Sequence, residues 1–193
     1  MKKTIITLFV SLLLLFSSVK VDAQIKNAFP GQKTRILFLL DASGSMLTEM
    51  GTTTRWSAAI NALTKMVDTL RGVNNLEVGL RVFGHNKPIT MRDCYDTKLE
   101  IPFGPNNHKQ MVNKLRTLKP LGFTSISQSL LATAKDFPEE KNVRNLIIII
   151  TDGIEECPAD PCLISAELQK KGIILRPFVI GLGSEREEMR LKY

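Results

Sequence analysis

Two unbroken apolar runs constrain the fold of this chain more than any other feature of its sequence. Segment 34–40 reads TRILFLL and is followed by Asp41, and segment 145–151 reads NLIIIIT and is followed by Asp152. Apolar runs of this length without alternation are typical of strands that are covered on both faces, as in a parallel sheet between helices. The sequence therefore predicts two central strands, each ending at an aspartate.

Three further segments have strand patterns of another kind. Segment 76–83 alternates between apolar and polar residues, and segment 97–103 does so as well while containing Pro102. Proline removes a ladder donor, so we expect 97–103 to be an edge strand, paired antiparallel with 76–83 through the irregular segment 86–96. Segment 173–180, which also contains a proline, is expected near an edge. The apolar residues of the second alternating segment are Leu99, Ile101 and Phe103.

Helical patterns lie between these strands. Apolar residues recur at three- and four-residue steps in segments 56–70, 111–118 and 126–137, and Asp160 with Pro161 marks the start of a fourth helix. Strands that alternate with helices indicate an α/β protein. The expected fold is a three-layer sandwich with a mostly parallel central sheet, one antiparallel edge strand and helices on both faces.

The N-terminal residues are typical of an exported protein. Lys2 and Lys3 precede the apolar run 5–16, and small or polar residues follow it up to Ala23. This order is that of a secretory signal peptide, and the run is shorter than the roughly 20 residues that span a bilayer. We expect cleavage after Ala23, a periplasmic or secreted mature chain, and no stable membrane span once the signal is removed. An uncleaved anchor is the alternative.

The rest of the chain is expected to form one domain. Residues 24–33 are assigned to a short linker and residues 34–193 to the domain. Ser184 and Glu187 resemble a capping box that opens a last helix, which Tyr193 would cut short. Hydrophobic residues make up 44% of the chain and charged residues 23%, which argues against global disorder. The net charge of +7 is scattered and no aromatic run is interleaved with arginine, so nucleic acid is not an expected partner.

The chain has three cysteines, an odd number. In an oxidising compartment two of them are expected to pair. Cys157 and Cys162 enclose a four-residue loop, so a local disulfide between these two is the first expectation, with a bridge from either one to Cys94 as the alternative. A zinc site is the competing interpretation, but three cysteines without a nearby histidine make a poor tetrahedral ligand set.

Polar residues gather where the two central strands end. In open α/β sheets ligands bind beyond the carboxyl ends of the strands, and the loop before helix 126–137 would bring a further hydroxyl to that edge. Two carboxylates and three hydroxyls are hard oxygen donors, suited to Mg²⁺, Mn²⁺ or Ca²⁺. Because hydroxyls are neutral, a cation held by them stays electrophilic, and an open coordination position would attract a carboxylate from outside. The candidate ligands are Asp41, Ser43, Ser45, Thr124 and Asp152.

These five residues, in this order and at these strand ends, resemble the metal-ion-dependent adhesion site of the von Willebrand factor type A domain. The resemblance covers about residues 34–183, and the phrase DGIEECPADPC at 152–162 is similar to secreted bacterial members. It implies that Ser43, Ser45 and Thr124 contact the metal through their hydroxyls. The two aspartates would act through water or by hydrogen bonding those hydroxyls. It also implies a protein partner whose acidic residue completes the shell of the metal.

The expected function is therefore a non-enzymatic, cation-dependent protein-binding module for adhesion or assembly in the cell envelope or the secreted space. One alternative is a Mg²⁺-dependent hydrolase in the same fold, with Asp41 or Ser43 as nucleophile and His85 as base. The sequence DASGS does not match the nucleophile elbow GxSxG, and there is no Walker loop. Another alternative is a structural domain with a vestigial metal site. Two groups beside the motif stay open. Glu155 and Glu156 could be ligands, could tune the charge that a partner meets, or could form a solvated turn, and Met46, Leu47 and Met50 could be contact surface or core.

Overall fold

A computed structural model describes residues 31–153 and 155–179, and its centre is a five-stranded sheet. The strand order is β5-β4-β1-β6-β7. Strands β4, β1, β6 and β7 are parallel, whereas β5 pairs antiparallel with β4. This confirms the mostly parallel sheet with one antiparallel edge strand. The strands are β1 (Lys33–Asp41), β4 (Leu76–Phe83), β5 (Thr97–Gly104), β6 (Val143–Thr151) and β7 (Ile173–Val179).

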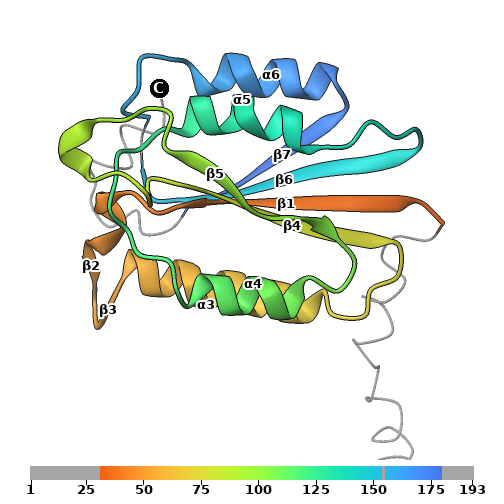
Figure 1. Cartoon of the computed structure of the whole chain (residues 1–193), viewed down its shortest axis with the longest axis horizontal. Helices are drawn as coiled ribbons and strands as arrows, with labels where there is room; N and C mark the ends of the chain where they lie inside the picture. Colours follow the sequence, from red (N-terminus) through yellow and green to blue (C-terminus); the bar gives the residue numbers. More distant parts are fainter. Residues whose placement is uncertain (1–30, 154, 180–193) are drawn as a thin grey trace, which may run out of the picture.

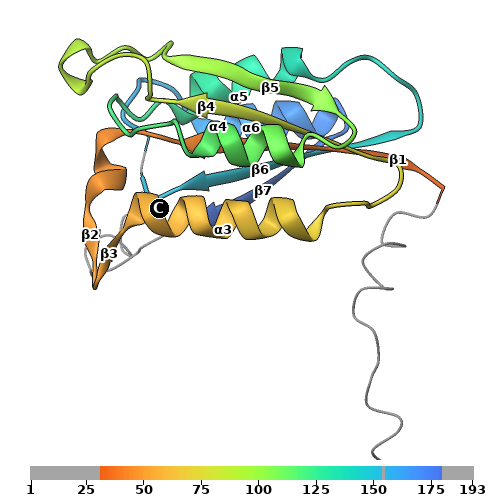
Figure 2. The ribbon, with the colours of Figure 1, turned by 60° about the horizontal axis from the view of Figure 1, so that its bottom comes forward.

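Helices cover both faces of the sheet, which completes the predicted three layers. One face carries α3 (Arg55–Thr69) and α4 (His108–Leu115), and the other carries α5 (Ile126–Asp136) and α6 (Pro161–Lys170), as Figure 1 shows and the turned view in Figure 2 confirms. Strand β1 explains the unbroken apolar run, because its successive side chains enter two different cores. Phe38 and Leu40 pack on the side of α3, whereas Leu37 and Leu39 pack on the side of α5.

Local chemistry sets the helix starts. Thr54 is the N-cap of α3 and accepts a hydrogen bond from the backbone N–H of Ser57 at 3.1 Å. Asp160 caps α6 through the N–H of Cys162, with Pro161 in the first turn, as the sequence predicts. Between β1 and α3 the chain forms the single-turn helix η1 (Gly44–Leu47) and the hairpin of β2 (Glu49–Met50) and β3 (Thr53–Thr54). The loop after β4 contains a second short turn, η2 (Ile89–Met91).

Strand β5 departs from the expected pattern. Its register with β4 shifts by one residue at two places, and each bulge moves the following side chains to the other face. Ile101 therefore joins the core under α3 and α4, whereas Leu99 and Phe103 pack against the opposite core. Strict alternation along 97–103 would place these three side chains on one face, but the bulges interrupt it.

Three expectations concern residues outside this description: the signal peptide 1–23, most of the linker 24–33, and the capping box of Ser184 and Glu187. Within residues 31–153 and 155–179, none of the helices combines the length and the apolar character that crossing a membrane requires.

Candidate functional site

Three loops meet at the carboxyl edge of the sheet, and backbone hydrogen bonds join them. The loop before α5 lies between the loops that follow β1 and β4: Gly44 N–H donates to Gly122 O at 2.9 Å, and Gly122 N–H donates to Gly84 O at 2.8 Å. Ser43 and Gly122 form an isolated parallel bridge. A Cβ at Gly122 would lie 2.7 Å from the carbonyl oxygen of Lys87, so this close backbone approach requires glycine.

Four of the predicted ligand residues form one hydrogen-bond network. The carboxylate of Asp41 accepts the backbone N–H of Ser43 at 2.7 Å. The hydroxyls of Ser43 and Ser45 lie 2.9 Å apart, and Ser45 donates to Asp152 Oδ1 at 3.0 Å. The second oxygen of Asp41 accepts a hydrogen bond from Thr151 at 2.5 Å. The ends of β1 and β6 thus present their polar side chains to one another.

Thr124 borders the same space. A Cβ placed on Gly153 would lie 3.7 Å from the Thr124 hydroxyl oxygen and 3.8 Å from Asp41 Oδ2. The hydroxyl of Thr124 and the carboxylate of Asp41 therefore flank the backbone of Gly153 from two different loops. The structure brings all five predicted residues together, and their role as metal ligands stays a prediction.

Burial dominates the electrostatics of Asp41. Its side chain is fully buried, and this burial raises the pKa of the carboxyl to about 6, against the opposing hydrogen bonds from Ser43 and Thr151. The negative charge of Asp152 raises the Asp41 pKa further. Two buried carboxylates at one strand edge favour a compensating positive charge.

Arg55 supplies part of that compensation. Its guanidinium Nη1 lies 2.6 Å from Asp152 Oδ2, and both side chains are almost completely buried. Neither Arg55 nor Thr151 is among the site residues predicted from the sequence. Thr151 directly precedes Asp152, and Arg55 opens the helix after the DASGS loop, but neither position has a pattern that distinguishes a site residue from a surface residue.

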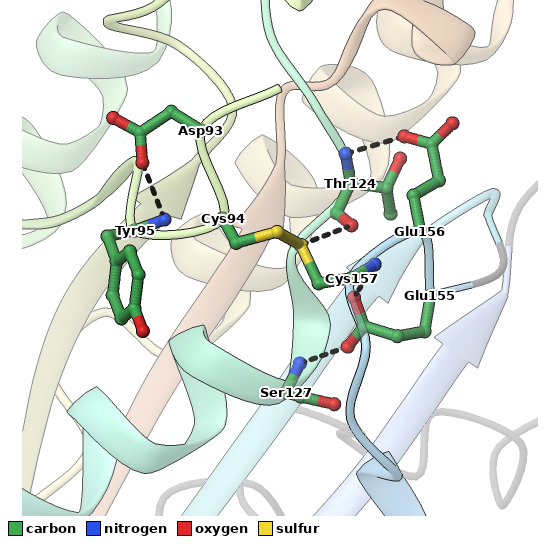
Figure 3. The surroundings of a disulfide bond; sticks show 8 residues. All are labelled: Asp93, Cys94, Tyr95, Thr124, Ser127, Glu155, Glu156 and Cys157. Carbon is green, nitrogen blue, oxygen red and sulfur yellow. Dashed lines mark hydrogen bonds between the residues drawn. A yellow bond between two sulfur atoms is a disulfide. The ribbon is translucent and has the colours of Figure 1, made fainter. Parts of the chain in front are cut away.

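A disulfide joins the loop beside the site to the loop after β4. It links Cys94 to Cys157 (Figure 3). Cys162 is free and exposed. The predicted Cys157–Cys162 bridge is therefore wrong, and the alternative through Cys94 is confirmed. The Asp160 cap holds Cys162 in the first turn of α6, facing solvent, whereas the Cys157 sulfur is buried 3.7 Å from the carbonyl oxygen of Thr124.

The two glutamates after Asp152 hold the Thr124 loop in place. Glu156 accepts the backbone N–H of Thr124 at 2.8 Å and returns its own N–H to the carbonyl of Thr124 at 3.1 Å. Glu155 accepts the N–H of Ser127 at 2.5 Å, in the first turn of α5, where a negative charge is favoured. Figure 3 shows both carboxylates turned toward this backbone. They are therefore not a simple solvated turn, because both accept hydrogen bonds from the backbone beside the site.

His85 faces another strand. Its Nε2 lies 3.0 Å from Glu100 Oε1, and among the described residues no hydrogen bond joins it to Ser43. Burial raises the pKa of Glu100, but hydrogen bonds from Lys114, His85 and Lys98 outweigh it and lower that pKa to about 2. Of the residues after the motif, Met46 is fully buried and Leu47 is exposed.

Comparison with known proteins places this geometry in a family. The family model of the von Willebrand factor type A domain matches residues 36–155. YwmD of Bacillus subtilis (strain 168) is 32% identical over 142 residues, which cover 71% of this chain and 61% of YwmD. The chain thus spans about three fifths of the length of that relative.

Solved structures share the fold at lower identity. An aerotolerance-related membrane protein from Bacteroides fragilis is 22% identical, with a TM-score of 0.64 over 79% of this chain and 74% of that one. Manganese-loaded TRAP protein of Plasmodium vivax is 21% identical, with a TM-score of 0.58 over 83% and 62%.

A third solved structure is proximal thread matrix protein 1 of the mussel byssus, described with a zinc-occupied MIDAS motif. It is 20% identical, with a TM-score of 0.60 over 81% of this chain and 38% of that one. The sheet order, the helices on both faces and the family match lead to one conclusion: this chain belongs to the von Willebrand factor type A domain family.

Proposed function

We propose that this domain is a non-enzymatic protein-binding module that uses a divalent cation, Mg²⁺, Mn²⁺ or Ca²⁺, held at the carboxyl edge of its sheet. Ser43, Ser45 and Thr124 would bind the cation through their hydroxyls. Asp41 and Asp152 would contribute through water or through hydrogen bonds to those hydroxyls. The observation that carries the proposal is the convergence of the five side chains from three separate loops.

The chemistry of the donors fits a hard cation. Each candidate donor atom is an oxygen, as Mg²⁺, Mn²⁺ and Ca²⁺ prefer. Across the described residues no group of three or more His, Cys, Asp or Glu side chains is placed to hold a metal, so a site of the Cys/His type has no support there. The manganese-loaded and zinc-occupied neighbours support a divalent cation in this fold, although their identity to this chain is near 20%.

The residues of the chain define how a partner would bind. The Ser43 backbone hydrogen bond orients the Asp41 carboxylate, and Arg55 offsets the charge of Asp152. This offset leaves less negative charge at the edge than two free carboxylates would. A cation at this edge would therefore retain affinity for an outside carboxylate, which we propose an acidic residue of a protein partner supplies.

We place the module outside the cytoplasm. The signal-like residues 1–23 and the Cys94–Cys157 disulfide both favour an oxidising compartment. The structural neighbour from Bacteroides fragilis is described as a membrane protein, which is consistent with an envelope location. The hydrolase alternative is weaker, because the ring of His85 is bound to Glu100.

Isothermal titration with Mg²⁺, Mn²⁺ and Ca²⁺ tests the proposal. The variant Thr124→Val removes one hydroxyl with little change of shape, and Thr133→Val makes the same change at a buried position in α5 away from the edge. We expect saturable binding of at least one cation in the parent and in Thr133→Val, and loss of that binding in Thr124→Val. Equal binding by all three proteins, or by none, would contradict the proposal.

A further inference from the structure

An apolar surface adjoins the candidate metal site. Seven large apolar side chains are exposed among the described residues. Five of them lie in the connections at the carboxyl edge of the sheet, short single-turn helices included, rather than on the α-helices: Leu47, Ile89, Met91, Tyr95 and Leu121. We call Ile89, Met91 and Leu121 the apolar rim, because hydrogen bonds tie their loops directly to the motif.

The contacts of the rim place it beside the proposed cation. Ile89 N–H donates to Leu121 O at 3.0 Å, and Leu121 N–H donates to Ala42 O at 2.9 Å. A Cβ at Gly44, between the two motif serines, would lie 3.5 Å from Ile89 Cδ1. Ile89 is therefore within van der Waals reach of the DASGS loop, and backbone hydrogen bonds place Leu121 next to it.

The loop that carries most of the rim is held firmly. The Asp96 carboxylate accepts the backbone N–H groups of Asn86 and Lys87 at 2.9 Å each. The Cys94–Cys157 disulfide and the hydrogen bond from Gly84 N–H to Asp96 O close the loop at its end. Exposed apolar side chains on a fixed loop lose little conformational entropy when they are covered, which favours binding.

The charge of the loop favours an acidic partner. Lys87 and Arg92 are exposed, and no ion pair joins either of them to another residue of the described part. The carboxylates of the same loop are engaged with its backbone, Asp93 with the N–H of Tyr95 and Asp96 with the N–H groups named above. The loop thus exposes Lys87 and Arg92, whereas its Asp96 carboxylate is buried against backbone N–H groups.

We infer that the partner of the proposed metal site is a protein segment in which an acidic residue lies next to large apolar residues. The acidic residue would bind the cation, and the apolar residues would cover Ile89, Met91 and Leu121. The inference rests on the proposed function, because the cation anchors the segment. Beyond the proposed function, it names the class of protein segment that would bind and the surface residues that would select this segment.

Selection of random displayed peptides on the purified protein in Mg²⁺, with elution by EDTA, tests this inference. We expect the eluted peptides to be enriched in an acidic residue flanked by Leu, Ile, Phe or Met. A synthetic peptide of the enriched sequence should bind about tenfold more weakly to Ile89→Ser, since that change removes most of one buried aliphatic side chain. Replacing its acidic residue by the amide should abolish the Mg²⁺-dependent binding.

Leu131→Ser is the matched control. Leu131 is 46% exposed, as is Ile89, but lies on α5. Its replacement should change the affinity less than twofold. One contrary result would be acidic peptides that show no apolar preference and bind equally well to Ile89→Ser and the parent. It would overturn the proposal that the apolar rim selects the segment, but not the proposed cation site. Peptide capture that EDTA does not release would overturn both, and a dimer in sedimentation that Ile89→Ser dissociates would show that a second copy covers the rim instead.

Discussion

Arg55 gives the sharpest test of the electrostatics at the sheet edge. Its guanidinium lies 2.6 Å from an Asp152 carboxylate that is fully buried. At an effective dielectric constant of about 20, two charges at this distance attract by about 6 kcal/mol, part of which the loss of hydration offsets. Removing one partner of a buried pair costs about 3–5 kcal/mol, because the other charge stays buried and uncompensated. We expect this loss in the unfolding free energy of Arg55→Met when EDTA is present.

Urea denaturation followed by circular dichroism measures this loss. Arg71→Met is the matched control, because Arg71, just after the end of α3, pairs with Asp68 of that helix but both side chains are at least half exposed. Exposed pairs of this kind contribute well under 1 kcal/mol. If Arg55→Met is no more destabilising than Arg71→Met, Arg55 does not stabilise the buried Asp152 carboxylate. This result would contradict the prediction.

A double-mutant cycle separates the pair from its surroundings. Combining Arg55→Met with Asp152→Asn should cost less than the sum of the two single changes, since no unpaired charge remains. Mg²⁺ adds a second readout, because a bound cation would replace the missing positive charge. We expect Mg²⁺ to stabilise Arg55→Met by more than it stabilises the parent protein. A coupling energy near zero would contradict the pairing.

Three further predictions concern the parts that hold the edge together. Cys94→Ser opens a disulfide that spans 63 residues and should lower the unfolding free energy by about 4 kcal/mol. Cys162→Ser should leave the unfolding free energy unchanged. A disulfide that involves Cys162 in peptide maps would contradict the Cys94–Cys157 pairing. The folded-state pKa of Glu100 is lowered to about 2, so its stabilisation is complete above about pH 4.5 and is lost as the pH falls toward 2. The stability gap between the parent and Glu100→Gln should shrink over that range, and a constant gap would refute the assignment. Gly122→Ala places a Cβ 2.7 Å from backbone and should lower the melting temperature clearly more than Gly44→Ala, where the nearest atom is 3.5 Å away.

The main elements of the fold and of the candidate site follow from local sequence patterns. Strand β1 can be predicted because every residue after Lys33 is buried, and burial on two faces leaves an unbroken apolar run. The start of α6 can be predicted because Asp160 and Pro161 cap the helix through their immediate backbone neighbours. The motif residues are readable because parallel strands bring their carboxyl ends to one edge, which places Asp41 near Asp152 without any knowledge of side-chain packing.

The remaining features depend on contacts between distant segments. The Cys94–Cys157 bridge joins residues 63 positions apart, and the choice between it and a local bridge depends on how the loop after β4 folds back over Thr124. The bulges of β5 are invisible in an alternating sequence, since they arise from pairing with β4. The sequence around Arg55 is that of an ordinary helix start. Only the position of β6 in the structure shows that the Arg55 side chain contacts Asp152.

Anomalous diffraction from crystals soaked in Mn²⁺ tests the central claim most directly. We expect one strong manganese peak at the carboxyl edge, within bonding distance of the hydroxyls of Ser43, Ser45 and Thr124, and its disappearance in Thr124→Val. A peak held by other residues, or no peak at the edge at saturating Mn²⁺, would contradict it.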